Sequence, residues 1–333
     1  VTFIRGDITK LNEVTAACAG IHTVYLTAAA INFMDKLPYQ WQRSFSVNVT
    51  GTENVIKACL DTGVTFLIFT STAHVTVRGD VLGTVAAPVA LTEEDEYVTK
   101  DTCVSYYGAT KALAESLIRQ ADGSNHTSSS GRGDSSSCLR TVCMRPVGIF
   151  GARDHMVVED MLNSKEYLFL GFTIYLDWAF VDNVAYAHLL GERKLREYCD
   201  PDTGKSVHAD AELVCGQPFL ITGHDAMTNN LFRTMLIHYG DIQVRLGPQR
   251  LIRLLGVGVN VLQRIFTTSF DKVLKPPMSY LTNAAINVLD LNLVVSSTRC
   301  KEVLGYVPVF SVEEGLQMSV HEHADAKNNV FHQ

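Results

Sequence analysis

The sequence predicts an α/β fold built around a parallel β-sheet, and three observations support this class. Short apolar segments rich in β-branched and aromatic residues alternate with longer helical segments over residues 1–151. Their order repeats the strand–helix–strand rhythm of a parallel sheet with helices on both faces. The 333 residues are 47% hydrophobic and 19% charged, which is the composition of a globular chain with a large core.

The elements of the first half follow from local patterns. Val64–Thr70 is a short run of apolar, β-branched and aromatic residues, so it predicts a buried strand. Gly63, just before it, is expected to end the preceding helix. Similar patterns predict, in order, a strand at 1–5, a helix near 11–19, a strand at 23–27, a helix at about 41–62, the strand at 64–70, a helix at 105–120 and a strand at 139–144.

The pattern becomes more irregular after Gly151. Residues 184–195 predict a helix with Asp182 as its N-cap, because an aspartate side chain accepts hydrogen bonds from the free N–H groups of a first turn. The remaining predicted elements are a strand at 218–222 and a helix at 231–239 that stops at Gly240.

Composition and charge exclude several classes of protein. The net charge of −7 disfavours nucleic acid as a main partner. The eight cysteines lack Cys-x-x-Cys or His-partner spacing, so they predict buried thiols in a reduced compartment, and no metal site is expected. Residues 122–137 are rich in Ser and Gly and have little to bury, which predicts a disordered surface loop.

Tyr107 and Lys111 are the main candidates for catalysis. Their spacing of four places both side chains on one face of the predicted helix, one turn apart. An ammonium close to a phenol favours the phenolate and can lower the tyrosine pKa, so Tyr107 could act as a general base on an alcohol. Thr72 lies in a hydroxyl cluster at the carboxyl end of the 64–70 strand, where open α/β sheets place their sites, and could hold the substrate oxygen.

The order of strand, hydroxyl cluster, Tyr/Lys helix, strand and Arg145-Pro146 loop resembles the extended short-chain dehydrogenase/reductases, and most closely the 3β-hydroxysteroid dehydrogenase family. The similarity covers about residues 1–323. It is carried by Gly6-Asp7-Ile8, Thr27-Ala28-Ala29, Asn48-Val49-Thr50-Gly51-Thr52, the Val-Asp-Asn-Val-Ala element at 181–185, the Leu-Gly-Tyr-x-Pro element at 304–308 and Glu313-Glu314-Gly315.

The resemblance implies a Rossmann-like doubly wound sheet with a smaller C-terminal substrate lobe. Residues 1–151 would form the dinucleotide-binding domain, 152–323 would complete the sheet and build the lobe, and 324–333 would be a tail. The implied activity is oxidation of a 3β-hydroxyl on a steroid or sterol with NAD or NADP, in which Tyr107 removes the proton and Thr72 holds the reacting oxygen. The implied cofactor-binding residues are Asp7 at the adenine, Thr27, Ala28 and Ala29 along the ribose–phosphate path, Asn48, Lys111 at the nicotinamide ribose, and Pro146 and Val147 beside the nicotinamide.

The chain departs from the family pattern at its start. A dinucleotide fold opens with a strand and a glycine-rich turn that holds the pyrophosphate. The segment 1–5 already resembles the third strand, so we expect an N-terminally truncated domain that lacks its first two strands and binds cofactor poorly. Two smaller departures are Leu26, where His is usual, and Thr72, which replaces the usual Ser but keeps the hydroxyl.

The apolar segment 250–266 leaves three interpretations open. Its uncharged stretch, 254–263, is too short to span a bilayer. It could lie in a membrane interface with arginines at its ends, cover an apolar substrate as a lid, or be an ordinary core helix. The first two suit a sterol. A cytoplasmic chain is implied, with attachment to the endoplasmic reticulum membrane and a homodimer as open alternatives.

Two other functions remain open at this stage. One is that of another extended reductase or sugar-nucleotide epimerase, which would share the Tyr/Lys pair. The other is that of a truncated relative that binds a partner without catalysis. The apolar segment 250–266 and the C-terminal elements favour the sterol dehydrogenase.

Overall fold

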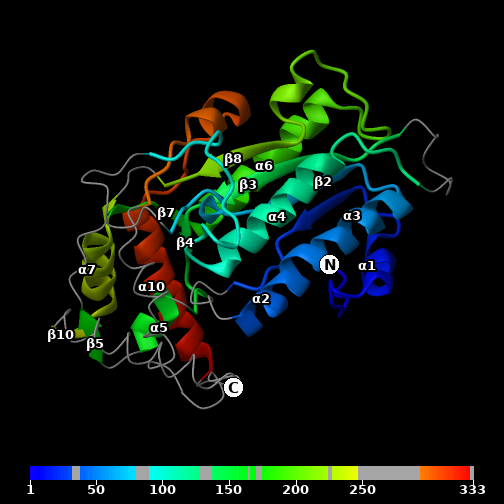
Figure 1. Cartoon of the computed structure of the whole chain (residues 1–333). Coiled ribbons are helices and arrows are strands. Elements are labelled where there is room, and N and C mark those ends of the chain that lie inside the picture. Colours follow the sequence, from blue (N-terminus) through cyan, green and yellow to red (C-terminus); the bar gives the residue numbers. More distant parts are fainter. Residues whose placement is uncertain are drawn as a thin grey trace.

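A computed structural model describes residues 1–31, 38–79, 90–127, 137–155, 157–163, 166–169, 175–223, 227–246 and 293–330. At its centre lies a parallel four-stranded sheet with the order β1-β2-β3-β8 (Figure 1). These strands are β1 (Thr23–Leu26), β2 (Phe66–Thr70), β3 (Arg140–Pro146) and β8 (Gln217–Ile221). The predicted parallel α/β sheet is confirmed.

Helices cover both faces of this sheet, because the strands alternate apolar side chains between two separate cores. Leu67 and Phe69 of β2 pack on one face with residues of α1 (Leu11–Cys18), α3 (Gly51–Thr62) and α4 (Tyr106–Ala121). Phe66 and Ile68 of the same strand pack on the other face with residues of α6 (Val181–Tyr198). The doubly wound arrangement is therefore confirmed.

The predicted helix at 41–62 has an irregular centre. It consists of α2 (Pro38–Phe45), a π-helical turn η1 (Ser46–Thr50) and α3. The helix ends at Gly63 as predicted, in a left-handed conformation with a φ of 76° that glycine adopts without steric cost. The π turn contains Asn48, one of the expected cofactor-binding residues.

The expected strand at residues 1–5 is wrong. This segment is irregular, and Val1 and Phe3 are fully exposed. A strand needs a hydrogen-bonded neighbour, and no described strand pairs with this segment. It is anchored further along, where the Ile8 carbonyl accepts a hydrogen bond of 2.9 Å from the Asn54 side chain of α3.

A third apolar core forms around Phe150, Trp178 and Phe232. The helices and strands that carry it lie to one side of the sheet (Figure 1). The rings of Trp178 and Phe232 stack with centroids 4.0 Å apart. The elements of this region are β4 (Gly148–Phe150), α5 (Val158–Asn163), β5 (Glu166–Phe169), β6 (Tyr175–Leu176), β7 (Trp178–Phe180), β9 (Met227–Thr228), α7 (Asn229–Gly240), β10 (Gln243–Leu246) and α10 (Val312–Val330). Three short helical turns complete the described chain: η2 (Ala73–Val75), η3 (Ala211–Leu213) and η6 (Cys300–Leu304).

Three local expectations need correction. Asp182 lies inside the first turn of α6, whose N-cap is Phe180. Residues 122–127 are ordered, because the Asp122 carboxylate accepts a hydrogen bond of 2.7 Å from the Thr141 backbone. Helix α10 continues through most of the expected tail, since it ends at Val330.

Other expectations fall partly outside the described residues. The segment 250–266 and residues 128–136 of the Ser/Gly-rich insert lie outside the residues that the structure describes. All eight cysteines are buried free thiols, as predicted. Within the described residues no helix has the length and apolarity needed to cross a bilayer.

Candidate functional site

Helix α4 brings Tyr107 against the turn that follows β2. The helix begins after Ser105, whose backbone is extended, and its first turn packs on η2. A Cβ atom on Gly108 would lie only 2.7 Å from the carbonyl oxygen of His74 in that turn. Glycine at position 108 therefore permits the close approach that places Tyr107 beside Thr72, the N-cap residue of η2.

Tyr107 and Thr72 are joined by a hydrogen bond between their side chains. The tyrosine ring is almost fully enclosed, with 6% of its surface exposed. Burial raises the pKa of Tyr107 to about 12, and the hydrogen bond from Thr72 acts in the opposite direction. The two hydroxyls expected to handle the substrate oxygen thus lie together.

Lys111 has a different set of contacts from those expected. Its Nζ donates to the carbonyl oxygen of Thr70 over 2.6 Å and lies 3.8 Å from the centroid of the Phe69 ring. Burial lowers the pKa of Lys111 to about 7, while the Glu115 carboxylate opposes that shift.

The expectation that Lys111 lowers the Tyr107 pKa is therefore wrong for this arrangement. Burial holds the pKa of the phenol above its ordinary value, and the group that opposes this shift is Thr72, not Lys111. The physical reason is that the ammonium is satisfied by the Thr70 carbonyl of β2, while the phenol is shielded from water.

Asn48 connects the segment after β1 to helix α4. Its side-chain oxygen accepts from the Ala30 N–H at 2.7 Å, and its nitrogen donates to the Ala30 carbonyl at 3.2 Å. The same nitrogen donates to the Thr110 hydroxyl at 3.0 Å. Asn48 is buried, so in this structure it holds the chain beside the expected cofactor path.

Most of the other expected cofactor-binding residues lie at the carboxyl ends of β1 and β3, the parallel strands on either side of β2, and therefore at one edge of the sheet. Thr27 and Ala28 follow β1 and are exposed, with the half-buried Ala29 after them. Pro146 ends β3, and the buried Val147 follows it.

Asp7 lies in the N-terminal segment, outside any strand. Its exposed carboxylate accepts hydrogen bonds from the Thr9 N–H at 2.9 Å and the Thr9 hydroxyl at 2.8 Å. These bonds lower the pKa of Asp7, so the group carries a negative charge at neutral pH. No described contact joins Asp7 to Tyr107 or Lys111.

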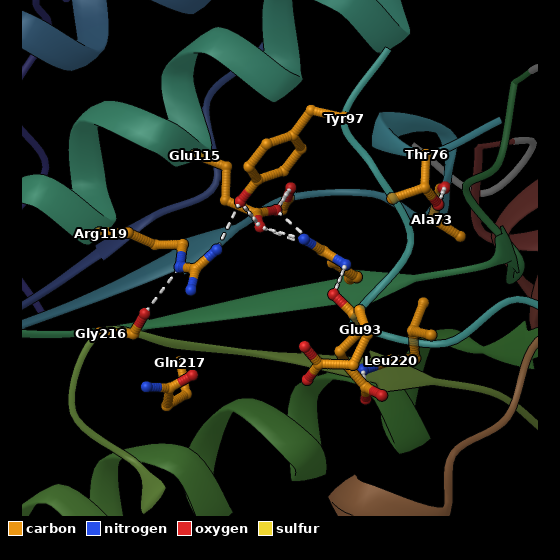
Figure 2. A network of polar contacts seen from close by, with 12 residues as sticks. Ala73, Thr76, Glu93, Tyr97, Glu115, Arg119, Gly216, Gln217 and Leu220 are labelled. Carbon is orange, nitrogen blue, oxygen red and sulfur yellow. Dashed lines mark hydrogen bonds and ion pairs between the residues drawn. The ribbon is translucent and has the colours of Figure 1, made fainter. Parts of the chain in front are cut away.

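Sequence reasoning missed Glu115, the buried centre of the polar network in Figure 2. It forms an ion pair of 2.7 Å with Arg145. The available signal was its spacing, since Glu115 follows Lys111 by four residues on the same helix and so shares its face. The partners from other elements could not be read from the sequence.

A comparison with protein families identifies the family of this chain. The profile described as the 3-beta hydroxysteroid dehydrogenase/isomerase family matches residues 1–246. This range contains every expected site residue, from Asp7 to Val147.

Several curated proteins are similar over nearly the whole chain. 3beta-hydroxysteroid-dehydrogenase/decarboxylase isoform 2 of Arabidopsis thaliana is 30% identical over 96% of this chain, which spans 51% of that protein. The human 3 beta-hydroxysteroid dehydrogenase type 7 is 29% identical over 94% of the chain and 79% of its own length. The decarboxylating sterol-4-alpha-carboxylate 3-dehydrogenase of Schizosaccharomyces pombe is 27% identical over 96% of this chain and 83% of its own length.

Solved structures agree on the fold. A UDP-glucose 4-epimerase from Thermotoga maritima superposes with a TM-score of 0.65 at 17% identity, over 98% of this chain and 85% of the epimerase. MoeE5 in complex with UDP-glucuronic acid and NAD gives a TM-score of 0.63 at 17% identity, over 97% and 85%. At these identities the likeness concerns the fold alone.

Proposed function

This chain belongs to the 3-beta hydroxysteroid dehydrogenase/isomerase family, and we propose that it oxidises a 3β-hydroxyl group of a steroid or sterol with NAD or NADP. The observation that carries the proposal is the hydrogen-bonded pair of Tyr107 and Thr72, with Lys111 one helical turn further along α4. An alcohol oxygen that replaces the Thr72–Tyr107 contact would meet both a hydroxyl donor and a proton acceptor.

The residues at the sheet edge fit a nicotinamide dinucleotide. Thr27 and Ala28 are exposed and small, so they leave room for a ligand along the end of β1. Asp7 offers an exposed carboxylate that could accept hydrogen bonds from adenosine hydroxyls or amines. Lys111, Pro146 and Val147 are proposed to hold the nicotinamide end. When bound, the dinucleotide supplies the acceptor for the two electrons that leave the alcohol carbon.

The chain itself handles the proton. With a pKa of about 12, the Tyr107 phenol is protonated at neutral pH in this arrangement, so it can donate a proton in the direction of carbonyl reduction. Acting as a base on an alcohol requires positive charge nearby, and the Lys111 ammonium is the group proposed to provide it. Thr72 is proposed to hydrogen-bond the reacting oxygen throughout.

The names of the relatives support a sterol as the substrate. The Schizosaccharomyces pombe relative is named a decarboxylating sterol-4-alpha-carboxylate 3-dehydrogenase. Oxidation of a 3-hydroxyl beside a 4-carboxylate gives a β-keto acid, a class of compound that readily loses carbon dioxide. A 3β-hydroxysterol 4-carboxylate is therefore the first substrate to test on this chain.

The test measures nicotinamide reduction by the purified chain with a 3β-hydroxysterol, its 4-carboxylate and UDP-glucose, each with NAD and with NADP. Sterol-dependent reduction that disappears in Tyr107→Phe would support the proposal. Reaction with UDP-glucose instead would reassign the substrate to sugar nucleotides. If neither dinucleotide raises the melting temperature of the chain, the proposed activity is refuted.

A further inference from the structure

Glu115 is a fully enclosed carboxylate on the face of α4 that carries the proposed catalytic pair. It follows Lys111 by four residues, as Lys111 follows Tyr107, so the three side chains form one row along the helix. None of the Glu115 surface is exposed. A buried charge of this kind is costly unless it is paired and hydrogen-bonded.

Both oxygens of Glu115 are occupied. The guanidinium of Arg145 donates from Nη2 to Oε1 at 2.7 Å, and from Nε to Oε1 at 3.0 Å and Oε2 at 3.2 Å. The Tyr97 hydroxyl donates to Oε1 at 2.7 Å, and the Ser71 hydroxyl donates to Oε2. Four donor groups on three other segments therefore converge on one carboxylate.

Two of these partners are chain neighbours of proposed site residues. Ser71 directly precedes Thr72, and its N–H also donates to the Met144 carbonyl at 2.6 Å. Arg145 directly precedes Pro146 at the end of β3. A movement of Glu115 would consequently be passed to the ends of both β2 and β3.

The network extends beyond these contacts, as Figure 2 shows. The Arg145 guanidinium donates from Nη1 to the Glu93 carbonyl at 3.2 Å, and the Glu93 carboxylate accepts from the Leu220 N–H of β8 at 2.8 Å. Arg119, one turn after Glu115, donates to the Tyr97 hydroxyl at 3.1 Å. Helix α4 is thereby tied to β2, β3 and β8.

Stability alone is a weak reason for such an arrangement. Replacing a buried ion pair with apolar side chains of similar volume is often neutral or stabilising. Moreover, the C-terminal end of α4 is already joined to β3 by the ion pair of 3.0 Å between its C-cap residue Asp122 and Arg140. What distinguishes the Glu115–Arg145 pair is its contact with the segment that carries Thr72.

We infer that Glu115 is a positioning residue: with Arg145 it fixes Ser71, and through Ser71 it holds the Thr72 hydroxyl against Tyr107, while its charge faces Lys111 one turn away. This inference rests on the proposed function for its kinetic consequence. Its structural part, the control of Lys111 by Glu115, holds for the protein without substrate.

Among the described residues, two ionisable groups lie close to Lys111 on the elements packed around it. They are Glu115 on the same helix and Cys143 on β3; burial raises the pKa of the Cys143 thiol and keeps it protonated, so the Glu115 carboxylate is the charge that opposes the effect of burial on Lys111. Glu115 is the larger of the two influences. Removing its charge should therefore lower the Lys111 pKa further below its ordinary value, so that the ammonium is lost at a lower pH.

The kinetic experiment compares Glu115→Gln with Asp122→Asn, since each variant breaks one ion pair between α4 and β3. We expect Glu115→Gln to lower kcat at least about tenfold with little change in KM, because a displacement of about 1 Å can cost as much as 10²-fold in rate. Asp122→Asn should keep kcat within about twofold at a comparable loss of thermal stability. Equal kcat losses in the two variants would overturn the inference.

Ser71→Ala provides a milder variant in case Glu115→Gln does not fold. It keeps the Glu115–Arg145 pair and removes only the link to the segment with Thr72. We expect a lower kcat at unchanged KM and a melting temperature lowered by only a few degrees, since one hydrogen bond to the buried carboxylate is lost. A kcat equal to that of the parent would contradict the proposed route through Ser71.

A readout independent of substrate separates this inference from the proposed function. With ¹³C-labelled lysine, the Cε signal of Lys111, assigned by its loss in Lys111→Met, reports titration of the ammonium. Its midpoint should move to lower pH in Glu115→Gln and stay in place in Asp122→Asn. A shift in a chain that is inactive on sterols would leave the inference standing and remove the proposed function; an unmoved midpoint would refute the inference.

Discussion

The Lys111 ammonium lies 2.6 Å from the carbonyl oxygen of Thr70, two residues before Thr72 in the chain. Helix α4 therefore contacts the end of β2 through two neighbouring points, one at Thr70 and one between Tyr107 and Thr72. The Thr70 carbonyl binds the Lys111 ammonium at the end of β2. The hydroxyls of Tyr107 and Thr72 meet at the start of η2. For Lys111 to favour the Tyr107 phenolate, its Nζ has to exchange this carbonyl for a position nearer the phenol.

Tyr107→Phe should abolish most of the activity. Loss of a general acid–base group typically costs about 10²–10⁴-fold in rate. The substitution removes the hydrogen bond with Thr72, so the free energy of unfolding should fall by about 1 kcal/mol for that bond. The measurement is nicotinamide reduction with a sterol, alongside urea unfolding.

Tyr106→Phe is the matched control, because Tyr106 is the preceding residue and is also buried. Its ring packs edge-to-face against Trp41, with centroids 5.2 Å apart, and phenylalanine preserves that contact. We expect nearly full activity. A loss in Tyr106→Phe as large as that in Tyr107→Phe would count against the assigned base.

Thr72→Ser should keep kcat within about tenfold, since it retains the hydroxyl, whereas Thr72→Val should lower kcat by about 10²–10³-fold through loss of the oxygen-binding donor. Thr76→Val serves as the control, because the buried Thr76 hydroxyl bonds only the nearby Ala73 carbonyl at 3.3 Å among the contacts described. Similar kcat values for the two valine variants would argue against a role for Thr72 in the reaction.

Lys111→Met should stabilise the fold in a pH-dependent way. In the unfolded chain Lys111 titrates near its ordinary pKa of 10.5, and in the fold its pKa is about 7. Between these values the unfolded state binds the extra proton, so the parent gains stability as pH rises, by up to about 1.4 kcal/mol per unit. Below about pH 7 Lys111 is charged in both the folded and the unfolded state, so the free-energy cost of burying the ammonium reaches its full value there.

Urea unfolding from pH 6 to pH 10 provides the test. The stability advantage of Lys111→Met over the parent should be largest below about pH 7 and should shrink toward pH 10. Lys57→Met, on the exposed side of α3, is the control for the loss of a surface lysine charge. An advantage that grows with pH would contradict the burial of a charged Lys111.

Gly108→Ala should weaken both folding and activity. The added Cβ would lie 2.7 Å from the rigid carbonyl of His74, so α4 or η2 must shift. Overpacking of this kind typically costs about 1–3 kcal/mol. The shift also separates Tyr107 from Thr72, so kcat should fall more than the loss of folded protein explains.

Gly191→Ala on α6 is the companion variant. There the new Cβ meets the terminal methyl group of Met144, a flexible side chain that can move aside. We expect a stability change within about 1 kcal/mol and little change in kcat. Thermal unfolding and initial rates for both glycine variants decide the comparison, and a greater kcat loss for Gly191→Ala would oppose this account of the site.

The strands and helices of the sheet were predictable because their signals are local. The apolar run at 64–70 contains β2, and the Tyr/Lys segment at 105–120 nearly coincides with α4. The predicted strand at residues 1–5 is wrong because a strand-like composition does not by itself supply a hydrogen-bonded neighbouring strand. The predicted N-cap role of Asp182 is wrong because the N-cap is the residue at which the backbone enters the helix, and here that residue is Phe180.

The sequence by itself determined the parallel α/β class, the family pattern and the spacing that aligns Tyr107, Lys111 and Glu115 on one helical face. Only the tertiary structure decided what those side chains contact: Thr72 for the phenol, the Thr70 carbonyl for the ammonium and Arg145 for the carboxylate. Helical periodicity is a property of neighbouring residues, whereas the partners, the burial and the resulting pKa values depend on strands that are distant in the chain and meet only in the folded sheet.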